Sequence, residues 1–544
     1  MVGHPPLARK AIRRALVALA VLTAGLNAQK FYDDDPIPKD PPPLSVEKIN
    51  GRKLSDYYDF FHNTFKKPGE RQGKGQRIPA RAINTLGEVP DSEWYTNRHY
   101  WKPLSIERLV SGAGNENAPE MSQTLTVIAA KTEGISPGFT MRDPRGRRYF
   151  VKFDPATNLE MATAADVICS KFFYALGYSV PENYIFNFRR EQLVVAPDAS
   201  FTDSQGKRRP MAERDVIDLL LDVPRLADGS YRAVASLSVP GIPVGPFRYY
   251  GTRSDDPNDI VPHEHRRDLR GLRVFSAWLA HEDSKSLNTL DTLIEENGKK
   301  FLRHCLIDFG TALGSQSIGP KSPLWGNEYL FAWKPAALQF FTLGLYVPRW
   351  ARAKYPNIPA VGRFEAQVFD PERWVPHYYN SAFSNCLPDD AFWAAKQVMA
   401  FSDEEIRAIV KTGGYTDSRA EQWIADCLIT RRDKIGRTYF AKVLPLDRFG
   451  IQDGKLVFED LAVKHKFVAS RDYQVEWFRF DNPSGLKVPL PLDKTFALPQ
   501  GLKAAAPGEY FGAHILGGDP KKLVTVYLRK RSGGIEVVGV DRTW

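Results

Sequence analysis

Two short stretches of the sequence carry the residue types that move a phosphoryl group from a nucleotide to a hydroxyl. One reads His-x-Asp-x-Lys-x-x-Asn and ends at Asn288, and the other reads Asp-Phe-Gly and begins at Asp308. In such a pair, Asp283 would position the attacking hydroxyl and Lys285 would offset charge on the moving phosphoryl group. Asn288 and Asp308 would hold a magnesium ion. The two stretches together therefore predict phosphoryl transfer.

The surroundings of the two stretches support this interpretation. The first pattern alone is expected by chance in roughly one chain in ten of this length and would then be a polar loop, but the pairing is far rarer. Apolar residues at helical spacing over 268–280 predict a core helix that ends where the first stretch begins. The β-like runs 289–294 and 301–307 flank Asn297-Gly298, the strongest short hairpin signal. We expect helix, loop, hairpin and metal-binding turn in that order.

Upstream, the sequence predicts a strand with one lysine, followed by a helix that begins with a glutamate. Lys152 lies amid apolar residues in the strand 148–153, and Glu160 lies one turn before Ala164 on the apolar face of the helix. A lysine that reaches from an edge strand to water and an acid favoured by the helix dipole would explain each residue separately. A glycine turn from Gly134 to Gly138 precedes the strand. The order of turn, lysine and glutamate favours a joint role.

The composition describes a large folded protein with a mild basic excess. The 544 residues are 43% hydrophobic and 12% aromatic, which suits two or three domains. The net charge of +10 falls to +6 without the four basic residues of 1–28. Lys and Arg are scattered rather than interleaved with aromatic residues, which argues against nucleic-acid binding. The four cysteines are too far apart for a metal knuckle, and the sequence leaves a Cys386–Cys427 disulfide open.

The N-terminal residues have the pattern of an export signal. A basic stretch, an apolar run from Ala15 to Ala24 and a small-residue site ending at Ala28 follow one another. The run of about a dozen apolar residues is short for a membrane span of roughly twenty, so we expect cleavage after Ala28 and no span beyond the signal. The alternative is an uncleaved anchor. In either case the bulk of the chain is exported, to the periplasm or the medium.

The stretch 253–259 is acidic enough to suggest a metal site. It reads Arg-Ser-Asp-Asp-Pro-Asn-Asp. Asp, Asn and Pro also build ordinary turns, and we expect turns here.

Residues 120–440 resemble the protein-kinase-like superfamily, nearer its atypical branches than its eukaryotic regulatory kinases. From Val151 to Pro181, a glutamate-bearing helix ends in a Leu-Gly-x-x-Val-Pro turn, which is similar to HipA-type and phosphatidylinositol-kinase-like proteins. The export signal adds a likeness to CotH-type spore-coat kinases and to the secretory-pathway kinases of animals. The glycine turn lacks the spacing G-x-G-x-x-G, and only seven residues separate Lys152 from Glu160.

The resemblance implies a role for each candidate residue. Lys152 would grip the α- and β-phosphates of ATP and would be steadied by Glu160, while the turn of Gly134 and Gly138 would cover the phosphates. Asp283 and Lys285 would be catalytic, Asn288 and Asp308 would hold Mg²⁺, and His281 would brace the loop. ATP and Mg²⁺ are the implied cofactors.

The expected fold class is α+β, a bilobal protein-kinase-like fold with an N-terminal wrapping segment and a C-terminal β-rich, sandwich-like domain. The expected parts are an export signal peptide (1–28), an acidic, proline-rich linker (29–44), the wrapping segment (45–118), a kinase-like small lobe (119–199), a connector with a helical large lobe (200–450) and the β-rich domain (455–544).

The function that these expectations favour is an exported atypical kinase that transfers the γ-phosphoryl group of ATP to a hydroxyl acceptor. Two alternatives stay open. Because free ATP is scarce outside the cytoplasm, the protein could be a non-catalytic kinase-like scaffold or binding module of the cell envelope. A kinase-like fold can also transfer the adenylyl group. The sequence identifies neither the acceptor, which could be a protein, a lipid or a small molecule, nor the oligomeric state.

Overall fold

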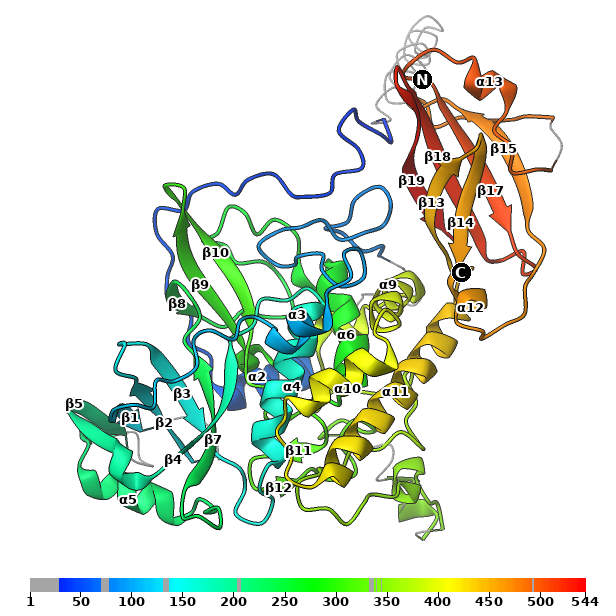
Figure 1. Ribbon diagram of the computed structural model, residues 1–544. Coiled ribbons are helices and arrows are strands. Elements are labelled where there is room, and N and C mark those ends of the chain that lie inside the picture. The colour runs from blue at the N-terminus through cyan, green and yellow to red at the C-terminus, as the bar shows by residue number, and fades with distance from the viewer. Residues whose placement is uncertain are drawn as a thin grey trace, which may run out of the picture. The chain divides into compact units, whose positions relative to one another are not determined.

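The structure is a computed structural model. It describes residues 29–69, 78–130, 137–202, 207–331, 337–338, 340–343, 345–491 and 494–544, and the expected signal peptide therefore lies outside the described residues. The chain divides into two compact units, and each is treated by itself (Figure 1). The larger unit comprises residues 38–83 and 89–442, and the smaller unit comprises residues up to Ile37, 84–88 and 443–544.

The sheet that carries Lys152 belongs to the larger unit. Among its described residues, seven strands form one sheet in the order β4-β7-β3-β2-β1-β5-β6. Lys152 ends β3 and lies opposite Gly138 on β2 and Val234 on β7. The strands are β1 (Leu125–Ala130), β2 (Gly138–Arg142), β3 (Arg148–Lys152), β4 (Asn183–Phe188), β5 (Leu193–Thr202), β6 (Arg208–Pro210) and β7 (Tyr231–Leu237).

Helix α4 (Met161–Ala175) connects this sheet to the helices of the same unit. All of α4 apart from Tyr174 is buried, because small and apolar residues occupy nearly every face. Figure 1 shows α4 between the sheet and the helices, and α4 contacts β4, β7 and α10. Further helices of this unit are α3 (Ile106–Ser111), α5 (Glu213–Leu221), α6 (Arg267–Leu279), α8 (Ser381–Ser384), α9 (Pro388–Val398), α10 (Asp403–Lys411) and α11 (Ser418–Phe440).

The expected hairpin around Asn297 and Gly298 is confirmed. Strands β9 (Thr289–Glu296) and β10 (Lys299–Leu306) pair in register, with β8 (Ile242–Gly245) on the far side of β9. The two turn residues have φ values of 52° and 73°, which Asn and Gly adopt most readily. The turn therefore fixes the register that sets Asp308 just beyond β10. Strands β11 (Ser315–Gln316) and β12 (Gly319–Pro320) follow.

The N-terminal part of the larger unit contains two short helices. They are α2 (Asp56–Phe61) and the π-helix η1 (His62–Lys66). Residues 44–61, here called the strap, run over the sheet of β8, β9 and β10, where Val46 N donates to Lys300 O and Arg52 N donates to Val244 O, both at 2.8 Å. The strap thus reaches the loop that precedes β9.

The smaller unit has its own core. In its described part a sheet of order β16-β15-β17-β18-β19 packs with the hairpin of β13 and β14, because Leu446 and Leu456 share a cluster with Trp477 and Ile515. The C-terminal part of this unit begins at Val443 rather than at 455. Its elements are β13 (Leu446–Gln452), β14 (Lys455–Asp460), α12 (Leu461–Lys464), β15 (Gln474–Phe480), β16 (Lys487–Pro489), α13 (Gln500–Lys503), β17 (Tyr510–Leu516), β18 (Leu523–Arg531) and β19 (Gly534–Arg542).

Residues 29–37 differ from the linker that the sequence predicts. Phe31 is fully buried in the smaller unit, with its ring 5.9 Å from Phe480, 5.7 Å from Tyr510 and 5.1 Å from Tyr527. An apolar ring outweighs the acidic, proline-rich composition around it, since its burial stabilises the core by roughly 1.5–3 kcal/mol.

All four cysteines lie in described parts of the chain and are free thiols, so Cys386 and Cys427 form no disulfide here. In the described ranges, no helix combines the length and the apolar character that crossing a membrane requires.

Candidate active site

A cleft of about 890 Å³ in the larger unit gathers most of the candidate residues. Strands β1, β2, β3 and β7, helix α4, the loop 281–288, the residues after β10 and the start of α2 all line it. Its lining includes Lys152, Asp283, Lys285, Asn288 and Asp308. Lys152 and Asp308, which lie 156 positions apart in the chain, are thus brought to one cavity.

Lys152 makes two ion pairs inside the cleft. Its Nζ lies 3.1 Å from Asp166 Oδ2 and 2.8 Å from Asp308 Oδ1. Burial alone would lower the pKa of Lys152, but the two carboxylates raise it above its ordinary value, so the side chain stays charged. A fixed positive charge at the end of β3 is therefore available to an anion.

Asp166 on α4 ties together three segments. Besides Lys152, its carboxylate accepts hydrogen bonds from the backbone N of Phe309 at 3.1 Å and from Asn183 Nδ2 at 2.9 Å. The bond to Phe309 couples α4 to the Asp-Phe-Gly turn. The position of Asp308, directly before Phe309, is therefore fixed through the same residue that holds Lys152.

The expectation that Glu160 pairs with Lys152 is wrong. Glu160 precedes α4 in a left-handed conformation with a φ of 70°, so it is not part of the helical face. Its carboxylate accepts instead from Thr416, from N at 2.8 Å and from Oγ1 at 3.2 Å. Asp154 caps α4, accepting from the N of Ala162 and of Thr163 at 2.8 Å. The buried acid that pairs with Lys152 is Asp166, which lies nearly two helical turns beyond Glu160.

The loop 281–288 folds back on itself around Asp283. Asn288 Nδ2 donates to Asp283 Oδ2 at 3.0 Å and to the Asp283 carbonyl oxygen at 2.7 Å, and Lys285 Nζ lies 3.4 Å from Asp283 Oδ1. The short 3₁₀ turn η4 (Ser286–Asn288) makes this return possible. Burial raises the pKa of Asp283 above its ordinary value, although Lys285 opposes the shift. The loop thus presents a carboxylate beside an ammonium group.

The residues around the Asp-Phe-Gly turn hold Asp308 at the cleft. Asp308 has a φ of 62°, a left-handed conformation that costs free energy and persists because its neighbours are packed. Phe309 is fully buried, 5.0 Å from the ring of Phe173, and the ring of His281 lies 5.7 Å from both. Burial lowers the pKa of His281 to about 3, so the ring is neutral. These contacts suit the bracing role expected of His281.

The two candidate glycines have different outcomes. Gly134 lies outside the described residues. Gly138 begins β2 and is not among the residues that line the cleft, whose wall here consists of Ala129, Ala130 and Thr140.

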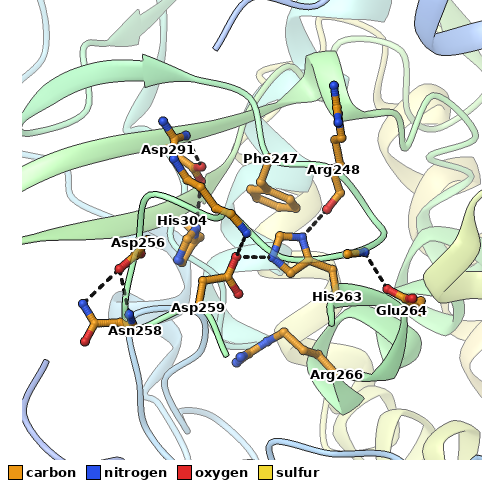
Figure 2. Close-up of polar contacts among 12 residues, drawn as sticks. Phe247, Arg248, Asp256, Asn258, Asp259, His263, Glu264, Arg266, Asp291 and His304 are labelled. Atoms are coloured by element: carbon orange, nitrogen blue, oxygen red, sulfur yellow. Dashed lines mark hydrogen bonds and ion pairs between the residues drawn. The ribbon is translucent and has the colours of Figure 1, made fainter. Parts of the chain in front are cut away.

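The acidic stretch 253–259 forms turns, as expected, and its side chains also form ion pairs. Figure 2 shows His263 facing Asp259 and His304 beside Asp291. Asp259 Oδ2 accepts from His263 Nε2 at 2.8 Å, and Asp291 Oδ1 lies 2.7 Å from His304 Nδ1. In the parts of the chain that the structure describes, no group of three or more His, Cys, Asp or Glu residues is arranged to hold a metal ion. These carboxylates thus form hydrogen bonds and ion pairs with other residues of the protein.

Two acids that line the cleft and pair with its lysines, Asp166 and Asp56, were not singled out from the sequence. Asp166 had one signal, since an acid within an otherwise apolar helix needs a partner. Asp56 begins α2, and its Oδ1 lies 3.3 Å from Lys285 Nζ. Nothing near Asp56 in the sequence indicates this contact, because its partner is 229 positions away.

Comparisons with known proteins give limited likenesses. No family model matches the chain. A segment of 89 residues is 34% identical to human growth arrest-specific protein 7, covering 15% of this chain and 17% of that protein, so the chain spans less than a fifth of this relative.

Two kinases are among the solved structures that the fold is similar to. The Helicobacter pylori proinflammatory kinase CtkA aligns over 58% of this chain and 98% of its own, with 11% identity and a TM-score of 0.29. The Golgi casein kinase aligns over 75% of this chain and 95% of its own, with 8% identity and a TM-score of 0.30. Its form with Mn/ADP bound gives 9% identity over 76% of this chain and 95% of its own, with a TM-score of 0.29. Likenesses at TM-scores this low do not define a function, so the function of this protein has to be inferred from the residues of the cleft.

Proposed function

We propose that this protein is an exported kinase-like enzyme that transfers the γ-phosphoryl group of ATP to a hydroxyl acceptor. The observation that carries the proposal is the convergence of one lysine from β3, three polar residues of the loop 281–288 and Asp308 on one cleft. Phosphoryl transfer depends on positioning and on electrostatic stabilisation, and these residue types supply both.

The nucleotide end of the cleft is formed by the sheet and α4. Lys152 would bind the α- and β-phosphates, and its two carboxylate partners keep it charged and oriented. Asp166 would keep its ion pair with Lys152 when the carboxylate of Asp308 binds a cation instead. Apolar side chains in the same wall, among them Ala130, Val234 and Ile307, are suited to contact the flat adenine ring of the nucleotide.

Asn288 and Asp308 are suited to hold Mg²⁺. The amide nitrogen of Asn288 is engaged by Asp283, which leaves its oxygen as the end that can bind a cation, and Asp308 contributes a carboxylate. Mg²⁺ prefers one or two protein oxygens together with phosphate oxygens and water. When bound, the ion would neutralise charge on the phosphates.

Asp283 and Lys285 would act on the transferred group. The acceptor oxygen forms a bond to the γ-phosphorus, the bond from that phosphorus to the oxygen of ADP breaks, and Asp283 accepts the proton of the hydroxyl. Lys285, whose ammonium lies 3.4 Å from Asp283, would offset charge on the phosphoryl oxygens as they move.

Labelled nucleotide tests the proposal directly. With Mg²⁺ and ATP labelled at the γ- or the α-position, the purified protein is expected to release ADP and to transfer only the γ-label, to water or to an added hydroxyl compound. Transfer of the α-label would identify an adenylyltransferase. Absence of nucleotide binding by calorimetry would favour the scaffold.

Substitution of Lys152 by methionine is expected to weaken ATP binding by at least about tenfold, because the phosphates lose a fixed positive charge. Calorimetric titration with ATP and Mg²⁺ measures the change. Lys411→Met, which removes an exposed lysine at the end of α10, is the matched control and should bind ATP as the wild type does. Equal affinities in the two variants would exclude Lys152 from the phosphate site.

The rate of transfer should fall in acid with a midpoint above 3.8, the ordinary pKa of an aspartic acid. Asp283 acts as its carboxylate, and burial raises its pKa, so protonation begins at a higher pH than in an exposed residue. No loss is expected near pH 6.5, since His281 has a pKa of about 3. The rate at saturating ATP, measured from pH 4 to pH 9, tests this. A step near 6.5 that disappears in His281→Asn would transfer the proton-accepting role to His281.

A further inference from the structure

A carboxylate from the strap, that of Asp56, forms an ion pair with Lys285, the lysine that the proposed function assigns to the γ-phosphoryl group. Lys285 Nζ lies 3.3 Å from Asp56 Oδ1 and 3.4 Å from Asp283 Oδ1. Burial opposes a charge on Lys285, but these two carboxylates raise its pKa above its ordinary value. Asp283 belongs to the same loop as Lys285. Asp56 belongs instead to the strap, near the start of the larger unit's sequence.

Helix α2 is oriented toward the loop by two acids on one face. Asp59 follows Asp56 by three positions, so both side chains point the same way. Asp59 is buried and accepts from Tyr378 OH at 3.1 Å and from Ser286 Oγ at 3.4 Å. The two acids of α2 therefore contact Lys285 and Ser286, which are consecutive in the loop. This double contact fixes where Asp56 lies.

The strap is also fastened upstream of α2. The side chain of Asn258 makes two hydrogen bonds to the backbone of Leu44, accepting from Leu44 N at 2.8 Å and donating to Leu44 O at 3.0 Å. Asn50 N donates to Asp255 Oδ2 at 2.8 Å. At Gly245 a β-carbon would lie 1.9 Å from the carbonyl oxygen of Arg52, so the strap packs against bare backbone. The acidic stretch 253–259, part of which Figure 2 shows, thus holds the strap in place.

We propose that Asp56 is a positioning residue that competes with the γ-phosphoryl group for Lys285. The inference depends on the proposed function. A γ-phosphate at Lys285 brings negative charge close to the Asp56 carboxylate, and two like charges a few ångströms apart repel. ATP must therefore displace Asp56 from Lys285, whereas ADP, which lacks the γ-phosphate, leaves the contact intact. The strap lowers the affinity for ATP relative to ADP.

The competition can be measured without knowledge of the acceptor. In calorimetric titrations with Mg²⁺, Asp56→Asn should bind ATP about fivefold more tightly than the wild type and bind ADP equally well, since a partly exposed ion pair contributes up to about 1 kcal/mol. Lys285→Gln should lose the gain, so that Asp56→Asn has no effect on ATP affinity in the Lys285→Gln background. Asp56 is 56% exposed, so its replacement should leave the melting temperature nearly unchanged.

Glu47→Gln is the matched control, because it removes the same charge from an exposed position on the same strap. It should change the affinity for neither nucleotide. Weaker ATP binding by Asp56→Asn, or an equal change for ATP and ADP, would overturn the inference while the proposed function stands. A wild type that binds neither nucleotide would refute the proposed function, and the inference with it.

Discussion

Asp283→Asn is expected to reduce phosphoryl transfer by about 10²–10⁴-fold, the range in which a positioned acid or base contributes to catalysis. The amide cannot accept the proton of the hydroxyl, although it keeps the shape of the side chain. ATP should still bind, because Lys152 and Asp308 are untouched. Rates of γ-label transfer and calorimetric affinities, taken on the same preparation, separate the two effects.

The same variant should be at least as stable as the wild type. Burial raises the pKa of Asp283, so the folded state favours the protonated carboxyl and loses stability as the pH rises through that pKa. At neutral pH the asparagine removes a largely buried charge that costs free energy. Asp426→Asn, on the exposed face of α11, makes the same chemical change outside the cleft and should be fully active. An Asp283→Asn protein that transfers phosphoryl at the normal rate would remove Asp283 from the mechanism.

Asp166→Asn is expected to lower kcat/KM for ATP by about 100-fold, since loss of one partner from a buried ion pair costs several kcal/mol. Lys152 would then keep Asp308 alone as its partner, and the lysine would compete with Mg²⁺ for that carboxylate. The Mg²⁺ concentration for half-maximal rate should therefore rise as well. A merely structural role of Asp166 would not produce this shift.

Glu160→Gln provides the comparison for Asp166→Asn. It makes the same change from acid to amide next to the same helix, and an amide oxygen can still accept from Thr416. Its rate and Mg²⁺ requirement should stay within about twofold of the wild type. If Glu160→Gln were the impaired variant and Asp166→Asn were normal, the pairing seen in the cleft would not govern nucleotide binding.

Elements set by local sequence were predictable. The turn at Asn297 and Gly298 fixes a hairpin because those residues tolerate a positive φ. Asn288 lies only five positions after Asp283, so a short loop is enough to bring its amide within hydrogen-bond distance of that carboxylate. Ser402 and Glu405 form a capping box at the start of α10, and Asp417 caps α11, so in each case residues close together in the sequence set where the helix begins. Where a few adjacent residues decide the geometry, their spacing in the sequence is sufficient.

Contacts between distant segments were not predictable in the same way. The apolar periodicity of the helix indicated one inward face and placed Glu160 on it, but α4 is buried on nearly all sides, and the acid that pairs with Lys152 is Asp166. The left-handed conformation of Glu160 had no clear sign in the sequence. The contact of Asp56 with Lys285 depends on the path of the strap across β8, which only the assembled unit defines.

The burial of Phe31 sets an order in which the chain can mature. Its ring packs against Phe480, Tyr510 and Tyr527, which the ribosome adds some four hundred and fifty to five hundred residues later. The larger unit, residues 38–83 and 89–442, can collapse around its own interior while synthesis continues, but the smaller unit must wait for its last strands. Until β18 is made, an early aromatic side chain stays exposed to solvent and to whatever accompanies the nascent polypeptide.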